Sequence, residues 1–413
     1  SYVTDNLRFN SSWSNAEATG TTDGRSVFQH LKTPGLTLTN DFRLLKNVGN
    51  RSFNLNCRAG YNQKPYQLAA ADYCQDYTAR NILANLNSSY GWRWGKFQLD
   101  YILTGDVNMQ NVGSELEGYA AADLRNDYWF NTYTVSVDQF MHLDLRHWYF
   151  SLNAALSSET QQLDDRAFGN RRTWSYVFLR PTAEVKYILG QSWFTLTSSY
   201  YHVVDNSQQA ARGTVMHSYR SFQRSIIDEA SRQQTLNNSL SFYHKNAHRQ
   251  FFFNGSASWL HSRSASVTGI DYEGTQMVCR VLPFEHDYDR LNFSAETSKG
   301  FDLWRSTVKL VGNYGLTETQ QLIQSRPTDV RTDYWSASAY VVASPTGWLS
   351  VAAAYAFGQS RSMGARLNTS TTRLDLNFLP HPRLVLNIAA EDNYNAVHAW
   401  FGDAKIKYKT KLI

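Results

Sequence analysis

The stretch GLTLTNDFRLLKNVGNRSFNLNCRAGYNQKP, residues 35–65, decides the fold. Its first half alternates apolar with polar side chains: Leu36, Leu38, Phe42 and Leu44 against Thr37, Thr39, Asp41 and Arg43. After residues 46–51, which supply the Asn and Gly of a tight turn, the alternation restarts at Phe53, Leu55, Cys57 and Ala59. Because neighbouring side chains of a strand point to opposite faces, the pattern predicts a hairpin with one apolar and one polar face.

The same alternation recurs along the chain and predicts about 18 antiparallel strands. They pair as 4–14 with 35–45, 52–62 with 80–91, 96–106 with 128–140, 147–157 with 172–188, 193–203 with 233–244, 249–261 with 289–299, 304–316 with 333–343, 348–358 with 371–379, and 384–393 with 402–412.

The connections between these strands alternate in length. Short joints such as 189–192 and 344–347 separate the pairs, whereas long joints within pairs span 107–127, 204–232, 262–288 and 317–332. This alternation is typical of a transmembrane β-barrel with tight periplasmic turns and longer extracellular loops. It requires 262–288, which includes Met277, Val278 and Cys279, to be a single long loop.

The composition fits a barrel whose polar lumen dilutes its apolar outer face. Of the 413 residues, 18% are charged and 14% aromatic, and the mean hydropathy is −0.48. No apolar run approaches the roughly 20 residues that a membrane helix needs. The net charge of +5 comes without a Lys/Arg-rich run, which argues against nucleic-acid binding. We expect residues 1–413 to form one outer-membrane barrel domain.

The tryptophans support a membrane position, because lipid-facing indoles prefer the membrane interface. Six lie beside predicted short turns: Trp92, Trp94, Trp148, Trp193, Trp304 and Trp348. Six others lie where strands meet long loops: Trp13, Trp129, Trp174, Trp259, Trp335 and Trp400. None falls in the middle of a strand, so the sequence predicts two aromatic girdles.

Charged residues identify the predicted lumen face. Glu184 and Lys186 alternate with Ala183, Val185 and Tyr187, and Arg373 and Asp375 oppose Leu374 and Leu376. Lys405, Lys407 and Lys409 form a basic stripe near the end of the chain. An Arg or Lys pointing into hydrocarbon costs about 2–4 kcal/mol at the midplane, so we expect all of these charges to face the lumen. The stripe could attract anionic solutes, although pairing with neighbouring acids is favoured.

No motif indicates catalysis, a cofactor or a metal site. Among the three cysteines, Cys74 and Cys279 fall in predicted long loops and could pair. Residues 285–287 (Glu-His-Asp) and Asp271 could activate a water, but solvated loop charges are the favoured interpretation. His244 and His248 flank a turn, where a structural role is favoured over metal binding.

The loop at 204–232 contains a helical pattern, with Phe222, Ile226, Ile227 and Ala230 on one face. It could fold into the barrel mouth and touch a ligand, or it could be a mobile surface loop. Candidate ligand-binding aromatic residues in the long joints are Tyr119, Tyr128, Phe222, Tyr272 and Tyr334. Such amphipathic side chains suit flat or sugar-like ligands, and they also suit a membrane interface.

The chain resembles the barrel region of a TonB-dependent outer-membrane receptor of the Bacteroidota type. The resemblance is carried by residues 35–65, by RPTAEVKYILGQSWFTL at 180–196 and by FGDAKIKYKTKLI at 401–413. It implies a barrel of about 22 strands filled by an N-terminal plug. Here neither a plug nor a TonB-contact segment precedes the first predicted strand, and a terminal aromatic residue is missing. We therefore expect a fragment that lacks about two strands at each end.

The resemblance implies a nutrient receptor in the bacterial outer membrane, not an enzyme. The receptor would bind a small ligand at its loops and import it through a plugged lumen. It would be driven by the inner-membrane TonB complex, and a surface lipoprotein is a possible further partner. Two alternatives remain open: a passive porin-type channel of 18 strands, and a barrel that binds a surface partner without transport.

Overall fold

The computed structural model describes residues 2–22, 25–70, 73–119, 124–204, 212–218, 220–225, 231–273, 276–381, 384–395 and 399–410. In the first half of the chain the strands are β1 (Tyr2–Thr22), β2 (Arg25–Val48), β3 (Arg51–Ala70), β4 (Tyr73–Trp94), β5 (Phe97–Glu117), β6 (Arg125–Asp144), β7 (Trp148–Asp165), β8 (Asn170–Leu189), β9 (Ser192–Val204), β10 (Val215–Ser218) and β11 (Ser221–Ser225).

The second half contains β12 (Arg232–Asn246), β13 (Phe251–Glu273), β14 (Gln276–Phe301), β15 (Ser306–Ile323), β16 (Arg326–Thr346), β17 (Leu349–Ser362), β18 (Ala365–His381), β19 (Leu384–Asn395) and β20 (Ala399–Thr410). A short 3-10 turn, η2 (Leu303–Arg305), precedes β15. In the part of the chain that the structure describes, no helix is long and apolar enough to cross a membrane.

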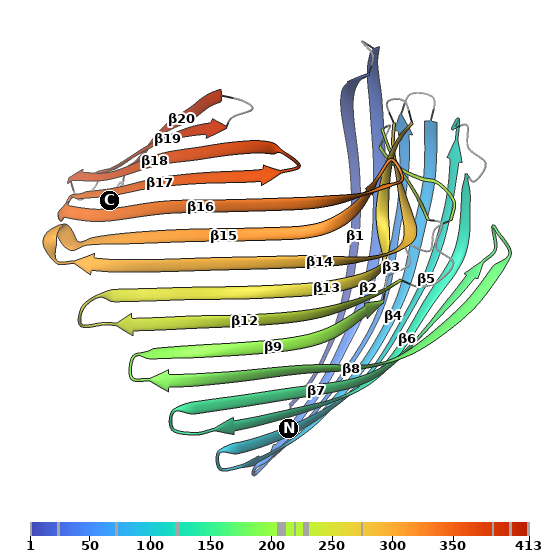
Figure 1. Cartoon of the computed structure of the whole chain (residues 1–413), viewed down its shortest axis with the longest axis horizontal. Coiled ribbons are helices and arrows are strands. Elements are labelled where there is room, and N and C mark those ends of the chain that lie inside the picture. Colours follow the sequence, from blue (N-terminus) through green and yellow to red (C-terminus); the bar gives the residue numbers. More distant parts are fainter. Residues whose placement is uncertain are drawn as a thin grey trace.

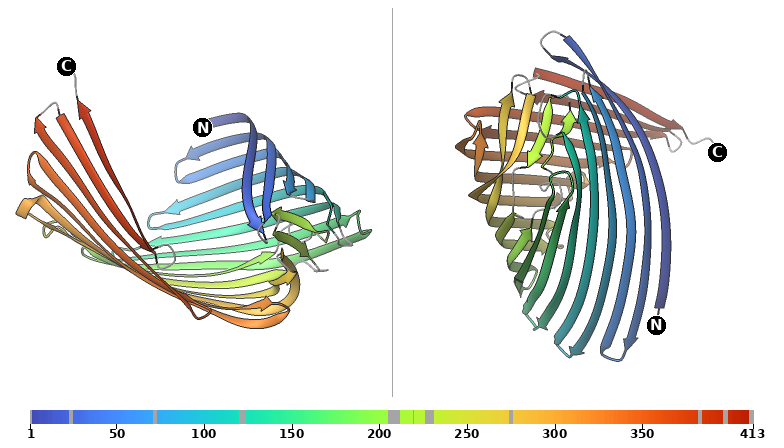
Figure 2. Two further views of the ribbon diagram at one scale, coloured as in Figure 1. Left: turned by 90° about the horizontal axis from the view of Figure 1, so that it is seen from above. Right: turned by 90° about the vertical axis from the view of Figure 1, so that its right-hand side faces the viewer.

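All the strands belong to one sheet of 20 strands (Figure 1). Each long strand pairs antiparallel with the next, from β1 to β9, and β9 then pairs with β12, from which the order runs on to β20. β10 and β11 are inserted between β9 and β12 as a separate short hairpin. The sheet curves round on itself, and β1 and β20 lie apart at its two ends (Figure 2).

The strand prediction is confirmed. Leaving out the β10–β11 hairpin, 18 long strands remain. Each predicted segment lies within one of them and overruns its ends by at most two residues, but many of the strands extend well beyond the predicted segment. Short turns also fall where expected. Gly190, for example, has φ +59° between β8 and β9, a conformation that glycine adopts without steric cost. The protein is thus an all-β chain with the antiparallel architecture of a transmembrane barrel.

The predicted long loops are mostly strand. Residues 107–127 and 317–332 largely continue β5, β6, β15 and β16, and 262–288 is the hairpin of β13 with β14. Residues 262–288 therefore form one connection without an additional pair of strands, as predicted. They are not a loop, however, because both halves continue β13 and β14 as an extended hairpin. A membrane span needs only about 9–11 residues of strand, whereas β14 has 26. About half of each longer strand thus extends beyond the membrane.

Strand register divides the sheet into two faces. We call the face that carries Glu184 and Lys186 the inner face, and its opposite the outer face. On β8 the outer face presents Val177, Leu179 and Leu189, which are 71%, 56% and 59% exposed. Paired residues lie on the same face, so the register carries this assignment from strand to strand. Apolar side chains that are exposed in this regular pattern belong in lipid.

Candidate functional site: the capped mouth

The short hairpin β10–β11 lies over the inner face near the ends of the strands that are remote from the short turns. We call residues 215–225 the cap hairpin. Its second strand pairs parallel with the start of β14, from Ser221 opposite Met277 to Ser225 opposite Val281. The cap hairpin thereby extends the β13–β14 hairpin across the mouth toward β3, β4 and β5 (Figure 1).

An apolar cluster holds the cap hairpin against the wall. Met216 and Phe222 of the cap hairpin have no exposed surface, and they pack with Leu68 of β3 and Leu116 of β5. Tyr119 stacks on Phe222 with ring centroids 4.5 Å apart. Full burial of a large apolar side chain contributes about 1.5–3 kcal/mol, so this contact is a docked interface and not a loose loop.

Polar side chains of the wall bind the backbone of the cap hairpin. The fully buried Gln75 accepts a hydrogen bond from the Met216 N–H at 3.0 Å, and its amide group donates to the carbonyls of Asp76 and Glu115. Tyr66 donates its hydroxyl to the Met216 carbonyl at 3.4 Å. Side chains of the barrel wall therefore hydrogen-bond the backbone N–H and carbonyl of Met216 in β10. This is expected, because buried backbone groups need hydrogen-bond partners.

Two further contacts tie the mouth together. Asn126 of β6, only 2% exposed, accepts from the Gly213 N–H and donates to Ser114 Oγ, both at 2.8 Å. Gln276, the first residue of β14, donates to the Tyr73 hydroxyl of β4 at 3.0 Å. Residues 87 and 203 positions apart in the sequence thus contact each other at the mouth.

A second apolar cluster continues along the inner wall. It contains the buried side chains of Val112, Tyr128, Phe130 and Leu163, with Tyr77 and Trp174 packed against it. Tyr77 also stacks on Tyr66, with ring centroids 4.6 Å apart. Burial raises the pKa of both Tyr66 and Tyr77, and the neighbouring Tyr77 raises that of Tyr66 further. The inner wall of β3–β8 is therefore aromatic and apolar above the membrane.

The predicted ligand-binding aromatic residues occupy different environments. Phe222, in the cluster under the cap hairpin, and Tyr128, in the second inner cluster, are 0% and 1% exposed, so neither offers surface to a ligand in this conformation. Tyr119 packs against the cluster of Phe222. Tyr272 is exposed near the end of β13, and Tyr334 lies across Gly315, with its hydroxyl donating to Asn292 at 3.5 Å. The structure brings Tyr119, Tyr128 and Phe222 into one region, and the other two lie elsewhere.

The helical pattern at 204–232 is not realised where the structure describes this loop. Phe222 belongs to β11, because the segment gains hydrogen bonds by pairing with β14. Ile226, Ile227 and Ala230 lie outside the described residues. Of the two alternatives for this loop, the less favoured one, in which it folds over the mouth, describes residues 212–218 and 220–225.

The described lumen candidates lie on the inner face. Glu184 pairs in register with Thr197, and Lys186 with Thr195. Arg373 and Asp375 form an ion pair at 2.7 Å. Lys405 and Lys407 pair in register with Ala389 and Asn387 of β19, and Lys409 with Val385, but the side chains of these lysines lie outside the described residues.

The girdle prediction needs two corrections. Trp193 pairs with Ile188 on the inner face, where its ring stacks on Tyr243 and lies 5.0 Å from the Lys186 ammonium. Trp174 packs into the second inner cluster. In both cases strand parity, not nearness to a strand end, sets the direction of the indole.

The other tryptophans are placed as follows. By register, the tryptophans that face outward are Trp13, Trp92, Trp94, Trp148, Trp129, Trp259 and Trp335. Trp304 and Trp348 lie exposed at short turns, and the Trp400 side chain lies outside the described residues.

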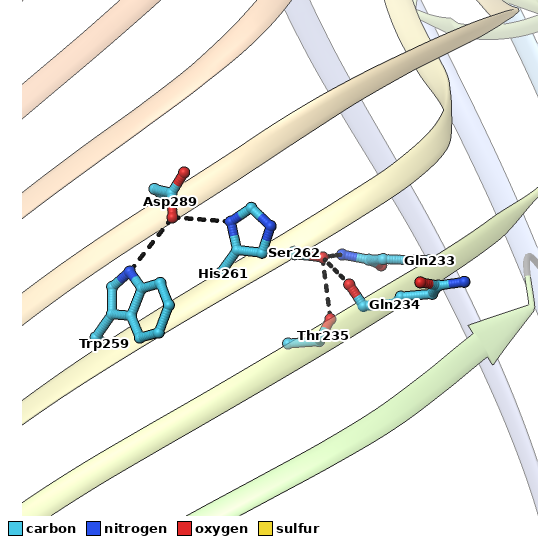
Figure 3. Close-up of polar contacts among 7 residues, drawn as sticks. All are labelled: Gln233, Gln234, Thr235, Trp259, His261, Ser262 and Asp289. Atoms are coloured by element: carbon cyan, nitrogen blue, oxygen red, sulfur yellow. Dashed lines mark hydrogen bonds and ion pairs between the residues drawn. The ribbon is translucent and has the colours of Figure 1, made fainter. Parts of the chain in front are cut away.

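β13 shows the alternation of faces directly (Figure 3). On the outer face, Asp289 accepts hydrogen bonds from the Trp259 indole at 3.3 Å and bonds to His261 at 3.0 Å. On the inner face, Ser262 accepts from Gln233 at 2.8 Å and bonds to Thr235 at 3.0 Å. Neighbouring residues of one strand thus belong to two separate polar networks.

The other chemical candidates do not converge. Asp271 lies 3.5 Å from Arg280, whereas Glu285 pairs with Arg263 at 2.6 Å. His244 bonds to Ser192 at 2.7 Å. Cys74 and Cys279 are both free thiols, which corrects the suggestion that they pair. Within the described ranges, no group of three or more His, Cys, Asp or Glu residues is placed to hold a metal ion.

The strand architecture is similar to that of several solved outer-membrane receptor barrels. The chain is similar to the ferric yersiniabactin uptake receptor FyuA from Yersinia pestis, at 10% identity and TM-score 0.57, over 99% of this chain and 68% of that chain. It is also similar to the ferric citrate transporter FecA in its unliganded form, at 8% identity and TM-score 0.57, over 97% of this chain and 67% of that chain.

A third similar structure is the alcaligin outer-membrane receptor FauA from Bordetella pertussis, at 11% identity and TM-score 0.52, over 97% of this chain and 68% of that chain. No protein-family model and no curated protein sequence matches the chain. At identities near one residue in ten, these likenesses establish the fold, and the ligand has to be argued from the site itself.

Proposed function

We propose that this chain is the barrel of a TonB-dependent outer-membrane receptor that binds a small nutrient at its capped mouth and imports it. The observation that carries the proposal is the docked cap hairpin over an aromatic inner wall. A passive pore has no need of a cap held by two buried residues and a fully buried glutamine. Aromatic side chains such as Tyr66 and Tyr77 supply rigid, amphipathic contact surface for a flat ligand.

The named neighbours suggest a class of ligand. FyuA and FecA carry ferric yersiniabactin and ferric citrate by their titles, and FauA is named for alcaligin. Because two of these three are ferric complexes by name, a metal chelate is the ligand class we propose to test first. The Bacteroidota type and a surface lipoprotein partner belong to the proposal on the sequence resemblance alone.

Residues 1–413 form one barrel domain in this proposal, and further strands close it. Among the described strands, β1 and β20 each pair along one edge only. Unsatisfied backbone groups in lipid cost several kcal/mol each, so both free edges need partners in the membrane. Energy coupling by the TonB complex would act through a plug domain seated against the inner face.

Uptake in cells that carry the complete gene tests this function. Cells are supplied with radioiron as ferric citrate or as a catecholate or hydroxamate chelate, with and without collapse of the proton gradient. The receptor function predicts binding in both states and accumulation only in energised cells. Accumulation that survives loss of the gradient would support the passive channel, and binding without accumulation would support a surface-binding barrel.

A further inference from the structure

The outer face carries a groove that the proposed transport function does not use. It has a volume of about 650 Å³ and crosses β14, β15, β16 and β17. Its floor contains the small residues Ala295, Gly312 and Ala337, and Phe253, Trp335 and Phe357 line its sides. Register places all six on the outer face, because Ala295 pairs with Gly312, Gly312 with Ala337, and Ala337 with Phe357.

The position of the groove fixes which molecules can reach it. The outer face below Trp335 is in the hydrocarbon layer, where the available molecules are lipids and other membrane proteins. The floor is hollow because glycine and alanine replace larger side chains. A β-carbon added at Gly312 would meet no atom within 4 Å, so the space above it is open. A groove of this size accommodates part of an acyl chain.

Two exposed arginines lie just beyond the aqueous end of the groove. Across the sheet, Trp335 pairs with Gln359, and Gln359 pairs with Asn368. Two residues further along the strands, away from the short turns, Asp333 pairs with Arg361, and Arg361 pairs with Arg366. Two residues of strand span about 7 Å, which is the distance from an interface tryptophan into the head-group layer. Arg361 and Arg366 are directly opposite each other on adjacent strands.

Like charges placed opposite each other are destabilising unless a counter-charge lies between them. Asp333 faces Arg361 from the other side, and the next outward arginine on β16, Arg331, is paired with Glu318 at 3.2 Å. Glu318 is thus balanced by Arg331, and Asp333 can balance only one of the two arginines Arg361 and Arg366. These two guanidinium groups therefore keep one surplus positive charge between them. Arginine binds phosphate oxygens through paired N–H donors, so a phosphate fits this position.

We propose that this groove and the Arg361–Arg366 pair form a specific site for one anionic lipid of the outer leaflet. An acyl chain would lie on Ala295, Gly312 and Ala337, and the phosphate-bearing head group would lie between the two guanidinium groups. The recognition is by charge and by shape together. It is independent of the proposed transport function, since it uses the opposite face of the sheet.

Native mass spectrometry of the detergent-purified full-length protein tests the site. The probe is an equimolar mixture of dimyristoyl phosphatidylglycerol and dimyristoyl phosphatidylcholine. Each arginine near an anionic lipid contributes about fivefold to affinity, so the native protein should retain phosphatidylglycerol over phosphatidylcholine by at least about fivefold. The double variant Arg361→Gln/Arg366→Gln should lose this preference.

A groove-filling variant separates shape from charge. Gly312→Leu places a side chain in the open space and should reduce retention of both lipids. Gly105→Leu is its matched control, because Gly105 is also an outward glycine of a strand with no atom within 4 Å of an added β-carbon. Arg171→Gln is the control for charge, since Arg171 lies opposite Asp164 on the far wall. Heat-dependent gel mobility confirms that each variant is folded.

Three outcomes would overturn the proposal. Equal retention of the two lipids by the native protein removes the role of the arginines. Loss of retention in Gly105→Leu as large as in Gly312→Leu removes the groove. A dimer of the chain that disappears in Gly312→Leu would show that a second copy, and not a lipid, covers this surface.

Discussion

The two walls of this sheet use their inner faces in opposite ways. The N-terminal wall, β3–β8, is apolar on its inner face above the membrane, where Leu68, Val112, Leu116 and Tyr128 are 1–2% exposed. The C-terminal wall, β15–β18, carries small and charged residues on its inner face, where the Arg373–Asp375 ion pair and the pair of Lys309 with Glu296 of the neighbouring β14 remain accessible. The inner face of the N-terminal wall is thus suited to packing against the cap hairpin, and that of the C-terminal wall is suited to contact with water.

This contrast fits the proposed receptor, which has to combine closure with passage of a ligand. The cap hairpin docks on the N-terminal wall, where burial of apolar surface supplies the free energy. We expect a hydrated path along the C-terminal wall, because its exposed ion pairs contribute little stability and do not attract a cover. The asymmetry can be broken experimentally at either wall, and the expected effects differ in size.

The largest effect is expected from Phe222→Ala in the cap hairpin. Removing a fully buried phenylalanine costs about 3–5 kcal/mol, and here the loss falls on docking of the cap hairpin. We expect hydrogen exchange of amides in residues 215–225 to accelerate by about a hundredfold or more. Barrel strands such as β7 should keep their protection, because they do not depend on the cap hairpin.

Tyr272→Ala is the matched control for this prediction. Tyr272 belongs to β13, the strand that pairs with β14 beside the cap hairpin, but its side chain is 58% exposed. Its truncation should leave exchange in residues 215–225 unchanged. If Phe222→Ala behaves like this control, the cap hairpin is held by β14 alone, and the contrast between the walls loses its physical basis.

A smaller effect is expected from Gln75→Leu. This change keeps the approximate volume and removes the acceptor of the Met216 N–H, together with donors to two carbonyls. An unsatisfied buried polar group costs about 1–3 kcal/mol. The Met216 amide should exchange about tenfold faster or more, while amides of the C-terminal wall stay unchanged. No change at Met216 would mean that water replaces the glutamine, so that this part of the wall is not dry.

The sequence predicted the 18 long strands because their alternation is local and is enforced by lipid on one side. The cap hairpin was not predictable in this way. Its partners Gln75 and Met216 are separated by 141 residues, and no periodicity links them. The sequence did not predict that residues 107–127 mostly continue the strands. Outside the membrane no lipid requires one face of a strand to be apolar, so the alternation of apolar and polar side chains is weaker there.

The errors at Trp193 and Trp174 were both avoidable by counting strand parity. Phe194 and Leu196 mark the outer face of β9, so counting from them puts Trp193 on the inner face. Trp174 has the same parity on β8 as Glu184 and Lys186, so counting back from these charges also puts it on the inner face. There it packs against the cluster that contains Phe130 and Leu163.

A third prediction concerns pH and the stacked pair Tyr66 and Tyr77. Burial raises the pKa of each, and an unfolded tyrosine titrates near about 10. Because the docked state holds these protons more tightly, its stability is fully present below about pH 10 and falls as the pH rises further. Exchange in residues 215–225 should therefore accelerate above about pH 10 in the native protein.

The control for this pH effect is Tyr66→Phe/Tyr77→Phe, which retains the rings and removes the ionisable hydroxyls. It should reduce the acceleration above about pH 10, after correction for the intrinsic pH dependence of exchange. Ultraviolet absorbance of tyrosinate should show a corresponding late-titrating fraction that is missing from the variant. A native protein in which every tyrosine titrates together would show that the wall beneath the cap hairpin is open to solvent.

The smallest effect is expected at the C-terminal wall from Glu296→Gln. Glu296 lies 2.9 Å from Lys309, and the two side chains are 32% and 41% exposed. Accessible ion pairs contribute about 0–1 kcal/mol, so the urea midpoint of barrel unfolding in detergent should shift little. A loss of more than about 2 kcal/mol would indicate a buried charge left unpaired. The C-terminal wall would then be as dry as the N-terminal wall, and the hydrated path would have to lie elsewhere.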